Sequence, residues 1–448
     1  MNRLKYSQNL VSQKWRCPKK KNYIVSSLYE FMKKVPDPRC DREKEHECAA
    51  MLTYLIIAYI VGKTSLRRAQ KWAVHNEKQL RKWLNIKKRI ASVSTLQRLL
   101  AGIDEEEFVH VFTQWMTEIL HQVGINIIID GKALRGATER IKDGTTPYIL
   151  NAIDMSTQLV LSQLAIECKK NEISTIPLFF NQLELEGNTV FIDAIGTQID
   201  IMNRILDGKG HYFLTVKKNQ LAIYEEILGF FRMIEEQMRL DKERNDDAYR
   251  KVQDISRYYD RCYKAEKNRE RYEHREAKSC TNFYLDSRCE DVFDTVKTIG
   301  QIRNVRIPIE KDAEGNDMTR SLNEFLEKGS IRKPKIREGD SFGDDVEMFG
   351  IITDQVMGAE EIYEENRSRW HIESALHHVL DDDFREDRSP AKKCKNNLAL
   401  IRKFAYNILR IAIIKSGKDI GVQEMMDEFD ASWSLVERFV FNGIEALS

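Results

Sequence analysis

Two acidic residues at the ends of apolar runs are the first candidates for chemistry in this chain. Residues 125–129 (Ile-Asn-Ile-Ile-Ile) lead into Asp130, and residues 189–192 (Thr-Val-Phe-Ile) lead into Asp193. Apolar, β-branched runs of this length predict buried strands. One aspartate at a strand end more often only caps a turn, but two carboxylates at the ends of two strands of one sheet can converge on a divalent metal ion.

A third acidic residue, Glu373, lies in a segment with helical periodicity, residues 360–381. The i, i+3 and i+4 spacing puts Glu373 on the same face as Trp370 and Leu376. A carboxylate beside apolar side chains needs a partner or a metal ion, because burying it alone is costly. The alternative is a helix-surface ion pair with Arg369, one turn earlier.

The elements around the first two carboxylates predict a mixed sheet with helices. The expected order is strand, strand, strand, helix, strand, helix, strand, over residues 125–130, 148–154, 159–167, 172–183, 189–193, 197–206 and 211–216. This order is typical of a ribonuclease-H-like sheet, in which the first and fourth strands are neighbours. Asp130 and Asp193 would then lie side by side.

Composition excludes several classes of protein. A chain of 448 residues is expected to form two or three domains. Its eight cysteines include no Cys-x-x-Cys motif, so reduced thiols are expected rather than disulfides or a zinc site. The most apolar stretch, residues 48–61, is shorter than the roughly 20 residues that span a bilayer. We therefore expect a buried helix there and no membrane partner.

Charge is distributed unevenly along the chain. Residues 1–100 hold 23 Lys and Arg against 7 Asp and Glu, a net +16; since the whole chain is +1, the remainder carries −15. This asymmetry predicts a polyanion-binding front end joined to a metal-binding body; the alternative is a solvated basic surface without a partner. Short helices with basic outer faces, such as the one with Arg67, Arg68 and Lys71, indicate nucleic-acid binding.

The expected domain boundaries follow from these changes in composition. They are a basic arm (1–22), a helical N-terminal DNA-binding domain (23–122), the first part of the catalytic domain (123–224), an insertion (225–345), and a C-terminal part of the catalytic domain with the third acidic residue and terminal helices (346–448). Tyrosines in the insertion could stack on bases, but their charged neighbours favour a solvated helical face. They are Tyr258, Tyr259, Tyr263 and Tyr272.

Stretches over most of the chain match the pattern of one family. They are residues 35–39 (Val-Pro-Asp-Pro-Arg), 129–136 (Ile-Asp-Gly-Lys-Ala-Leu-Arg-Gly), 170–173 (Lys-Asn-Glu-Ile), 192–198 (Ile-Asp-Ala-Ile-Gly-Thr-Gln), 214–220 (Leu-Thr-Val-Lys-Lys-Asn-Gln) and 370–373 (Trp-His-Ile-Glu). Together they resemble the H-repeat-associated transposases, the ISAs group of bacterial insertion sequences, within the DDE transposases. Four positions depart from the pattern, Lys218, Ser374, His378 and Asp382, and none of them is one of the three carboxylates.

The resemblance implies a fold and a function. The fold would be α/β, a ribonuclease-H-like mixed-sheet catalytic domain with an insertion, preceded by a small all-α N-terminal domain. The protein would bind double-stranded DNA at the element's terminal inverted repeats and at the target, and would catalyse Mg²⁺-dependent strand cleavage and strand transfer. It would act as a homodimer or higher oligomer on DNA, in the bacterial cytoplasm at the nucleoid. The alternatives are a metal-dependent nuclease of the same fold and a non-mobile DNA-binding derivative.

This reaction assigns roles to the candidate residues. Two Mg²⁺ ions, or Mn²⁺ in their place, lie about 4 Å apart in such sites and act on the nucleophile and the leaving oxygen. Asp130 would bridge the ions, with Asp193 and Glu373 completing the ligands. The candidate phosphate contacts are Lys132, Arg135, Lys217 and Arg369.

Histidines and a tryptophan surround the third carboxylate. His371, His377 and His378 are expected to face DNA or to be packed, because zinc sites need more nitrogen or sulfur ligands close by. We expect Trp370 to pack beneath the site and to fix the Glu373 rotamer. The alternative is an indole that stacks on an extruded base.

Overall fold

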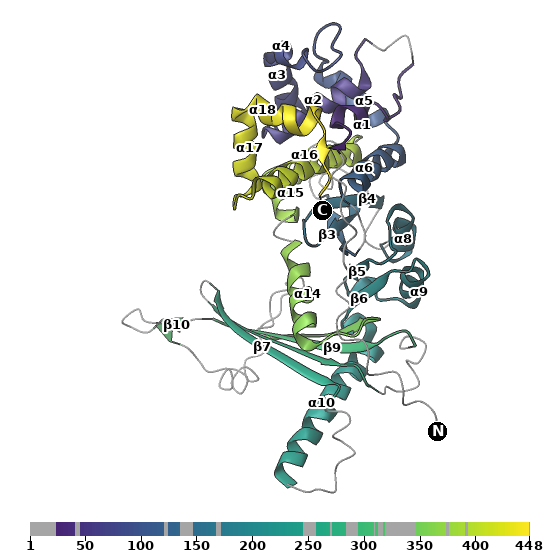
Figure 1. Cartoon of the computed structure of the whole chain (residues 1–448), viewed down its shortest axis with the longest axis vertical. Coiled ribbons are helices and arrows are strands. Elements are labelled where there is room, and N and C mark those ends of the chain that lie inside the picture. Colours follow the sequence, from purple (N-terminus) through teal and green to yellow (C-terminus); the bar gives the residue numbers. More distant parts are fainter. Residues whose placement is uncertain are drawn as a thin grey trace.

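The computed structural model shows an elongated molecule with helices at one end and a large twisted sheet below them (Figure 1). The structure describes residues 24–40, 45–120, 124–134, 147–166, 172–244, 257–268, 271–283, 294–308, 310–311, 317–318, 346–372, 376–389 and 393–447. Arg135 and Glu373, two of the expected site residues, lie outside these ranges.

Nine strands of the described residues form one mixed sheet, which confirms the α/β class. Its strands, in spatial order, are β4 (Val160–Ile166), β3 (Tyr148–Asp154), β2 (Asn126–Ala133), β5 (Thr189–Ile192), β6 (His211–Val216), β12 (Val346–Thr353), β9 (Thr298–Pro308), β8 (Arg271–Cys280) and β7 (Tyr259–Asn268). The first and fourth strands of the body, β2 and β5, are parallel neighbours as expected, and β5 also pairs in parallel with β6. The other pairs are antiparallel.

The apolar runs form strands because both faces of this part of the sheet are covered. All four residues of β5 and the three isoleucines of β2 are buried. Helices α8 (Glu172–Phe179) and α9 (Ile199–Asp207) connect the strands, and helix α6 (Glu105–Ile119) packs on β4. Continuous hydrophobic runs are typical of parallel strands that are covered in this way.

The insertion extends the sheet. Helix α10 (Leu221–Arg244) leaves the body, and strands β7, β8 and β9 add to the sheet beside β12. A separate pair of short strands, β10 (Glu310–Lys311) and β11 (Asp317–Met318), lies beyond the end of the large sheet, at the left of Figure 1. The prediction of a helical face for the insertion's tyrosines was wrong: Tyr259 and Tyr263 lie on β7, and Tyr272 lies on β8. The dense charges had suggested a solvated helix, but they are paired between strands and with a helix.

The upper helices come from both ends of the chain (Figure 1). The N-terminal helices are α1 (Leu28–Met32), α2 (Cys48–Ile60), α3 (Leu66–His75), α4 (Glu77–Leu80), α5 (Val93–Gly102) and α6; the C-terminal helices are α16 (Lys395–Ser416), α17 (Val422–Ala431) and α18 (Trp433–Val436). Every residue of α2 is buried, which confirms the predicted buried helix. None of the helices in the described part of the chain has the length and apolarity to cross a membrane.

Aromatic contacts and a strand pair join the two sets of helices. Trp72 stacks on Trp433 with ring centroids 5.8 Å apart, and Trp83 stacks on Phe441 at 5.1 Å. Strand β1 (Ile24–Val25) pairs with β13 (Ile444–Glu445), so the described ends of the chain meet in the same module. Residues 393–447, expected with the catalytic domain, therefore also complete the core of the N-terminal helices.

Helix α16 connects this module to the sheet. Its Asn407 accepts a hydrogen bond from Val160 N at 3.0 Å and donates one to Val160 O at 2.8 Å, on edge strand β4. Asn397 donates to Leu100 O and Ile103 O at the end of α5. An edge strand and a helix end each leave backbone groups without a hydrogen-bond partner in their own element. The side-chain amides of Asn407 and Asn397 supply these partners.

We predict that Phe404→Ala destabilises the whole molecule. Phe404 is fully buried on α16, and its ring lies 4.7 Å from that of Phe112 and 5.2 Å from that of Trp115. Replacing a buried phenylalanine with alanine lowers the free energy of unfolding by about 3–5 kcal/mol, so calorimetry should show a clear fall in Tm. Met233→Ala on α10, where the side chain is 56% exposed, is the control. Equal Tm values for the two variants would contradict a core shared by α6 and α16.

Candidate active site and nucleic-acid interface

Asp130 and Asp193 lie on neighbouring strands, at the point where β5 ends. The strand end expected at Asp130 was wrong, because β2 continues to Ala133 by pairing with β3. Ile129 and Ile192 are register partners in the parallel pair β2–β5, so the residue that follows each of them is one of the two aspartates. The Asp130 side chain is 40% exposed and Asp193 is exposed. Asp193 accepts a hydrogen bond from Ala194 N at 2.6 Å, which caps a short 3₁₀ turn and orients the carboxylate. Accessible carboxylate oxygens of this kind suit Mg²⁺.

The chain that follows Glu373 passes close to Asp130. The described part of helix α14 is Ala359–Ile372, and α15 is His378–Asp382; Glu373 lies between them in the sequence. His377 Nδ1 lies 3.5 Å from Asp130 Oδ2, and the His377 side chain is only 13% exposed. The structure thus brings together the two aspartates and the chain that follows Glu373, and Glu373 itself is outside the described residues.

The other two histidines differ from His377. His378 is exposed and its Nδ1 lies 3.1 Å from Asp382 Oδ2, one turn later on the same helix. The side chain of His371 lies outside the described part of the structure. Of the two expected environments for these residues, His377 has the packed one.

Lys132 is buried instead of facing solvent. It lies two residues after Asp130 on the same side of β2, and its side chain is 8% exposed. Its ammonium donates to Asp381 Oδ1 at 2.6 Å and to Glu386 Oε2 at 2.8 Å. Burial alone would raise the pKa of Glu386, but Lys132 and Arg402 hold it below its ordinary value. Lys132 therefore ties β2 to the segment that follows Glu373.

Lys217 and Arg369 lie around an exposed tryptophan. Lys217 follows β6, and its ammonium lies 5.8 Å from the Trp370 ring centroid and 3.5 Å from Glu347 Oε1. The Arg369 guanidinium lies 5.2 Å from the same ring. The prediction that Trp370 packs beneath the site was wrong, because the side chain is 44% exposed. Helical spacing predicts which residues share a face with Trp370, but it does not predict whether another element covers that face.

Tyr148 lies beside the carboxylates and was not among the predicted site residues. Its hydroxyl donates to Gly131 O at 2.9 Å, and a Cβ at position 131 would collide with the Tyr148 ring. Burial raises the pKa of Tyr148, and the carboxylates of Glu172, Asp130 and Asp193 raise it further. The available signals were the glycine directly after Asp130 and the tyrosine at the start of the next apolar run.

A preformed metal cluster is not seen in the residues that the structure describes: they contain no group of three or more His, Cys, Asp or Glu side chains arranged for an ion. The expected set includes Glu373, which falls outside them. The two aspartates nevertheless fit a Mg²⁺ site through their oxygen donors, their exposure and their position on neighbouring strands.

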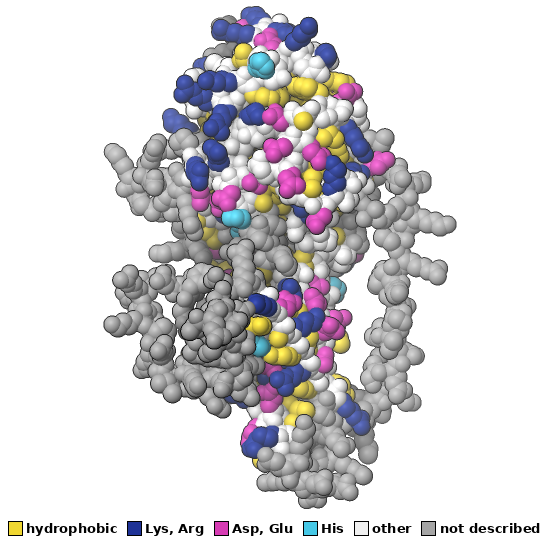
Figure 2. Space-filling view, turned by 90° about the vertical axis from the view of Figure 1, so that its left-hand side faces the viewer, with side chains coloured by type: hydrophobic (Ala, Val, Ile, Leu, Met, Phe, Trp, Pro, Cys, Tyr) yellow, Lys and Arg dark blue, Asp and Glu magenta, His cyan; other side chains and the backbone are white. Residues whose placement is uncertain are grey.

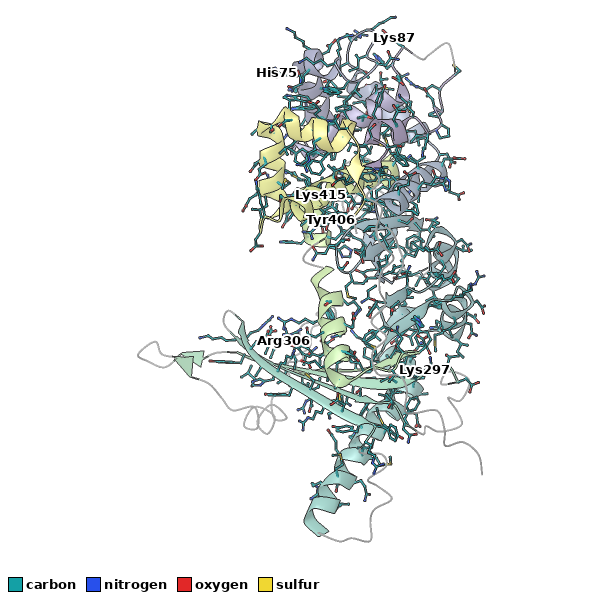
Figure 3. The ribbon with its side chains drawn as sticks, viewed as in Figure 1. His75, Lys87, Lys297, Arg306, Tyr406 and Lys415 are labelled. Atoms are coloured by element: carbon teal, nitrogen blue, oxygen red, sulfur yellow. The ribbon has the colours of Figure 1, made fainter. Side chains whose placement is uncertain are left out.

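Basic side chains gather on the outer surface of the upper helices (Figure 2). Exposed residues of α3 to α5 and their connections form this basic surface: Arg67, Arg68, Lys71, Lys78, Lys82, Lys87, Lys88, Arg89 and Arg98. Lys87 lies at the end of the molecule farthest from the β7–β8 hairpin (Figure 3). The charge asymmetry of the sequence is therefore a surface feature, and it is large enough to meet a polyanion.

Comparisons with known proteins identify the family of the chain. Residues 124–408 match the family described as "Transposase DDE domain", and residues 29–116 match "DDE_Tnp_1-associated". "Putative transposase YncI" of Escherichia coli O157:H7 is 26% identical over 390 residues, 86% of this chain and 88% of that protein. "H repeat-associated putative transposase YhhI" of Escherichia coli K12 is 27% identical over 197 residues, 44% of this chain and 52% of that protein.

A cryo-EM structure of a piggyBac transposase synaptic complex with hairpin DNA matches at a TM-score of 0.37 and 10% identity, covering 92% of this chain and 78% of that one, which supports no conclusion. Because the DDE domain match covers more than half of the sequence, the chain belongs to the family of DDE transposases.

Proposed function

We propose that the protein is the transposase of a bacterial insertion sequence, which binds the ends of its element and catalyses Mg²⁺-dependent DNA cleavage and strand transfer. The arrangement of the two aspartates supports this most directly. Asp130 and Asp193 directly follow Ile129 and Ile192, which are register partners on parallel strands, and His377, four residues after Glu373, lies 3.5 Å from Asp130. We also propose that strands β2 to β6 form a ribonuclease-H-like core, supported by the order β4-β3-β2-β5-β6.

Asp130, Asp193 and Glu373 would hold two Mg²⁺ ions, or Mn²⁺ in their place. When bound, such ions activate a water or a 3′-hydroxyl and neutralise charge on the scissile phosphate. The protein's own part is to hold the carboxylates in place. Ala194 N orients Asp193, and Lys132 ties β2 to the segment after Glu373. Glycine at position 131 lets the Tyr148 ring cover the backbone beside Asp130.

DNA would cross two surfaces. Near the carboxylates, Lys217 and Arg369 would contact phosphates on either side of the Trp370 ring, which is exposed enough to stack on a base. Arg135, five residues after Asp130, would add another contact. Lys132 is committed to two carboxylates, so we assign it a structural role instead of a phosphate contact.

The basic surface would bind double-stranded DNA through phosphates, with Arg67, Arg68 and Lys71 on one helix. An element has two ends that must be joined together, so we propose a homodimer or higher oligomer on DNA. The site of action would be the bacterial nucleoid in the cytoplasm, where the DNA substrate lies.

The first prediction concerns the carboxylates. Asp130→Asn, Asp193→Asn and Glu373→Gln should each abolish Mg²⁺-dependent cleavage of DNA carrying the inverted repeats that flank the gene, because an amide is a far weaker ligand for Mg²⁺. Binding of the same DNA should persist in a gel-shift assay. Glu424→Gln on α17, an exposed acid far from the site, is the control.

These assays also separate the alternatives. Cleavage near the wild-type rate in any of the three variants would remove that residue from the site. Cleavage without strand transfer by the wild type would identify a nuclease. Binding with no cleavage under any metal condition would identify a non-catalytic derivative.

The second prediction concerns the basic surface. The triple variant Arg67→Gln, Arg68→Gln, Lys71→Gln should bind end DNA more weakly, and its slope of log K against log salt should flatten by about 0.9 for each phosphate that the protein no longer neutralises. Fluorescence anisotropy over a salt series measures both. The control removes three exposed basic residues elsewhere, Lys209, Arg239 and Lys418, each paired with a glutamate. Identical slopes for the two triple variants would contradict the assignment.

The third prediction concerns Trp370. Because the side chain is 44% exposed, Trp370→Ala should change Tm little, whereas a buried tryptophan would cost about 3–5 kcal/mol. Loss of a stacking platform should slow processing of end DNA with an unpaired terminal base more than processing of fully paired DNA, and Trp370→Phe should retain most of the rate. A large fall in Tm with equal loss on both DNAs would instead favour a packing role.

A further inference from the structure

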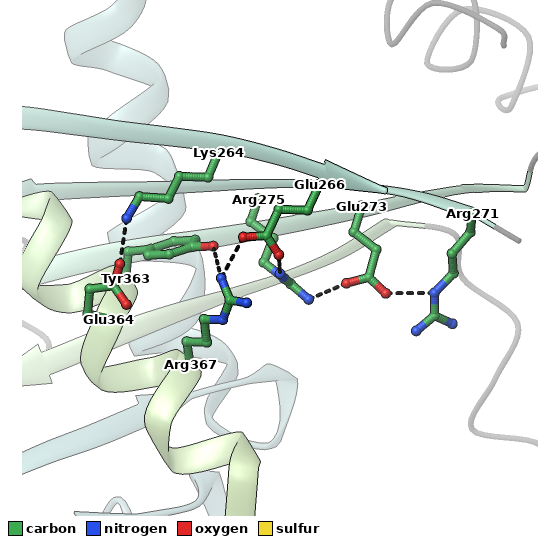
Figure 4. A network of polar contacts seen from close by, with 8 residues as sticks. All are labelled: Lys264, Glu266, Arg271, Glu273, Arg275, Tyr363, Glu364 and Arg367. Carbon is green, nitrogen blue, oxygen red and sulfur yellow. Dashed lines mark hydrogen bonds and ion pairs between the residues drawn. The ribbon is translucent and has the colours of Figure 1, made fainter. Parts of the chain in front are cut away.

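Helix α14 is joined to the β7–β8 hairpin by a network of charged side chains (Figure 4). Arg367 Nη1 on α14 donates to Glu266 Oε1 on β7 at 2.7 Å and lies 3.3 Å from the Tyr363 hydroxyl. One turn earlier, Lys264 Nζ of β7 donates to Glu364 Oε1 at 2.5 Å. At the helix start, Asp260 of the same strand accepts from Ala359 N at 2.8 Å. One strand therefore holds the helix at its start, its middle and near its end.

Some charged side chains of the β7–β8 hairpin face like charges within the hairpin and have their opposite-charge partners on helix α14. In the β7–β8 register, Lys264 lies opposite Arg275, and Glu266 lies opposite Glu273. Like charges that face each other across two strands are destabilising. Diagonal pairing relieves part of this, since Arg275 Nη1 lies 3.3 Å from Glu266 Oε2 and Arg275 also pairs with Glu273. The rest comes from α14, which provides Glu364 for Lys264 and Arg367 for Glu266.

The helix that this network holds leads directly to the third carboxylate. Arg367 lies five residues before Ile372, the last described residue of α14, and Glu373 follows Ile372 in the sequence. On the far side of Glu373, Asp381 is held by Lys132 of the strand that carries Asp130. The segment is thus anchored to the inserted hairpin before Glu373 and to β2 after it.

We propose that the inserted hairpin sets the position of the third carboxylate through the Glu266–Arg367 ion pair, and that these two are positioning residues for the metal site. The proposal rests on the proposed function, because it takes Glu373 as a metal ligand. It gives the insertion a role in the reaction: strands β7 and β8 lie at the sheet edge beyond β9, remote from Asp130 and Asp193, yet they hold the third element of the site.

The exposure of the pair makes the proposal testable. The Arg367 side chain is 37% exposed and that of Glu266 is 41% exposed, so screening by water leaves the pair a small share in overall stability. A carboxylate that must hold a metal ion, in contrast, is sensitive to small displacements, and loss of an outer partner typically costs about 10- to 100-fold in metal affinity or activity. Loss of the Glu266–Arg367 pair should therefore weaken metal binding much more than it lowers thermal stability.

The experiment uses the full chain with Glu266→Gln, Arg367→Gln, the double variant and the conservative Arg367→Lys. Mn²⁺ binding to the DNA-free protein is measured by calorimetry, along with cleavage kinetics and Tm. We expect each Gln variant to weaken Mn²⁺ binding about tenfold and to lower kcat with an unchanged KM for end DNA. Tm should move by less than about 2 °C. The double variant should lose no more than either single variant, because both remove one interaction.

The controls separate positioning from other effects. Arg367→Lys keeps the charge and should recover most of the Mn²⁺ affinity. Lys418→Gln breaks a comparably exposed pair with Glu428 on the upper helices and should leave Mn²⁺ binding unchanged. Mn²⁺ affinity unchanged in the Gln variants, or lost only in proportion to a fall in Tm, would overturn the inference. Wild-type Mn²⁺ binding that persists in Glu373→Gln would instead overturn the proposed metal site itself, so the two failures are distinguishable.

Discussion

A buried ammonium group organises the centre of this molecule. Lys132 points from the strand of Asp130 into the interior, where its charge would be unfavourable without partners. Asp381 and Glu386 supply them at 2.6 and 2.8 Å, and Arg402 of α16 lies 3.7 Å from the second oxygen of Glu386. Removing one member of such a cluster leaves the others buried and unpaired, which is more costly than the net gain from the pairs. Strand β2, the segment after Glu373 and helix α16 must therefore meet at this point.

The position of α16 has consequences for the rest of the chain. The same helix satisfies the edge strand β4 through Asn407 and the end of α5 through Asn397. Its aromatic side chain Phe404 packs among those of α6. The C-terminal helices thus join the sheet to the N-terminal helices that carry the basic surface. The basic surface and the two aspartates are built on one connected core and so keep a defined distance, which a flexible linker would not provide.

The insertion adds a second support from the opposite side. Its strands continue the sheet past β12: β9 pairs with β12 of the body, β8 pairs with β9, and β7 pairs with β8 at the edge. Their side chains then face α14 with like charges opposite each other, and the helix resolves the conflict. In the sequence, Glu373 lies between Arg367, which pairs with this network, and Asp381, which pairs with Lys132. Rigid supports around acidic ligands matter because adjacent carboxylates repel one another until a cation arrives.

Local patterns in the sequence determined much of this architecture. The apolar runs before Asp130 and Asp193 and the apolar stretch of α2 were predictable, because burial periodicity is set by neighbouring residues. The end of β2 was not predictable, because pairing with β3 carries that strand past Asp130 to Ala133. The pairing of the first and fourth strands followed from the order of elements. The exposed basic face of α3 followed from its helical spacing.

Other features depend on which element covers which side chain, and only the tertiary structure decided them. Lys132 is buried because Asp381 and Glu386, about 250 residues later, reach it. Trp370 is exposed because the elements of the described chain leave much of its ring uncovered, and Gly131 is needed because the Tyr148 ring crosses its backbone. The charged insertion forms strands because its charges are paired across β8 and with α14. Each of these is a long-range effect, and the periodicity of a sequence shows which side a residue faces but not what lies there.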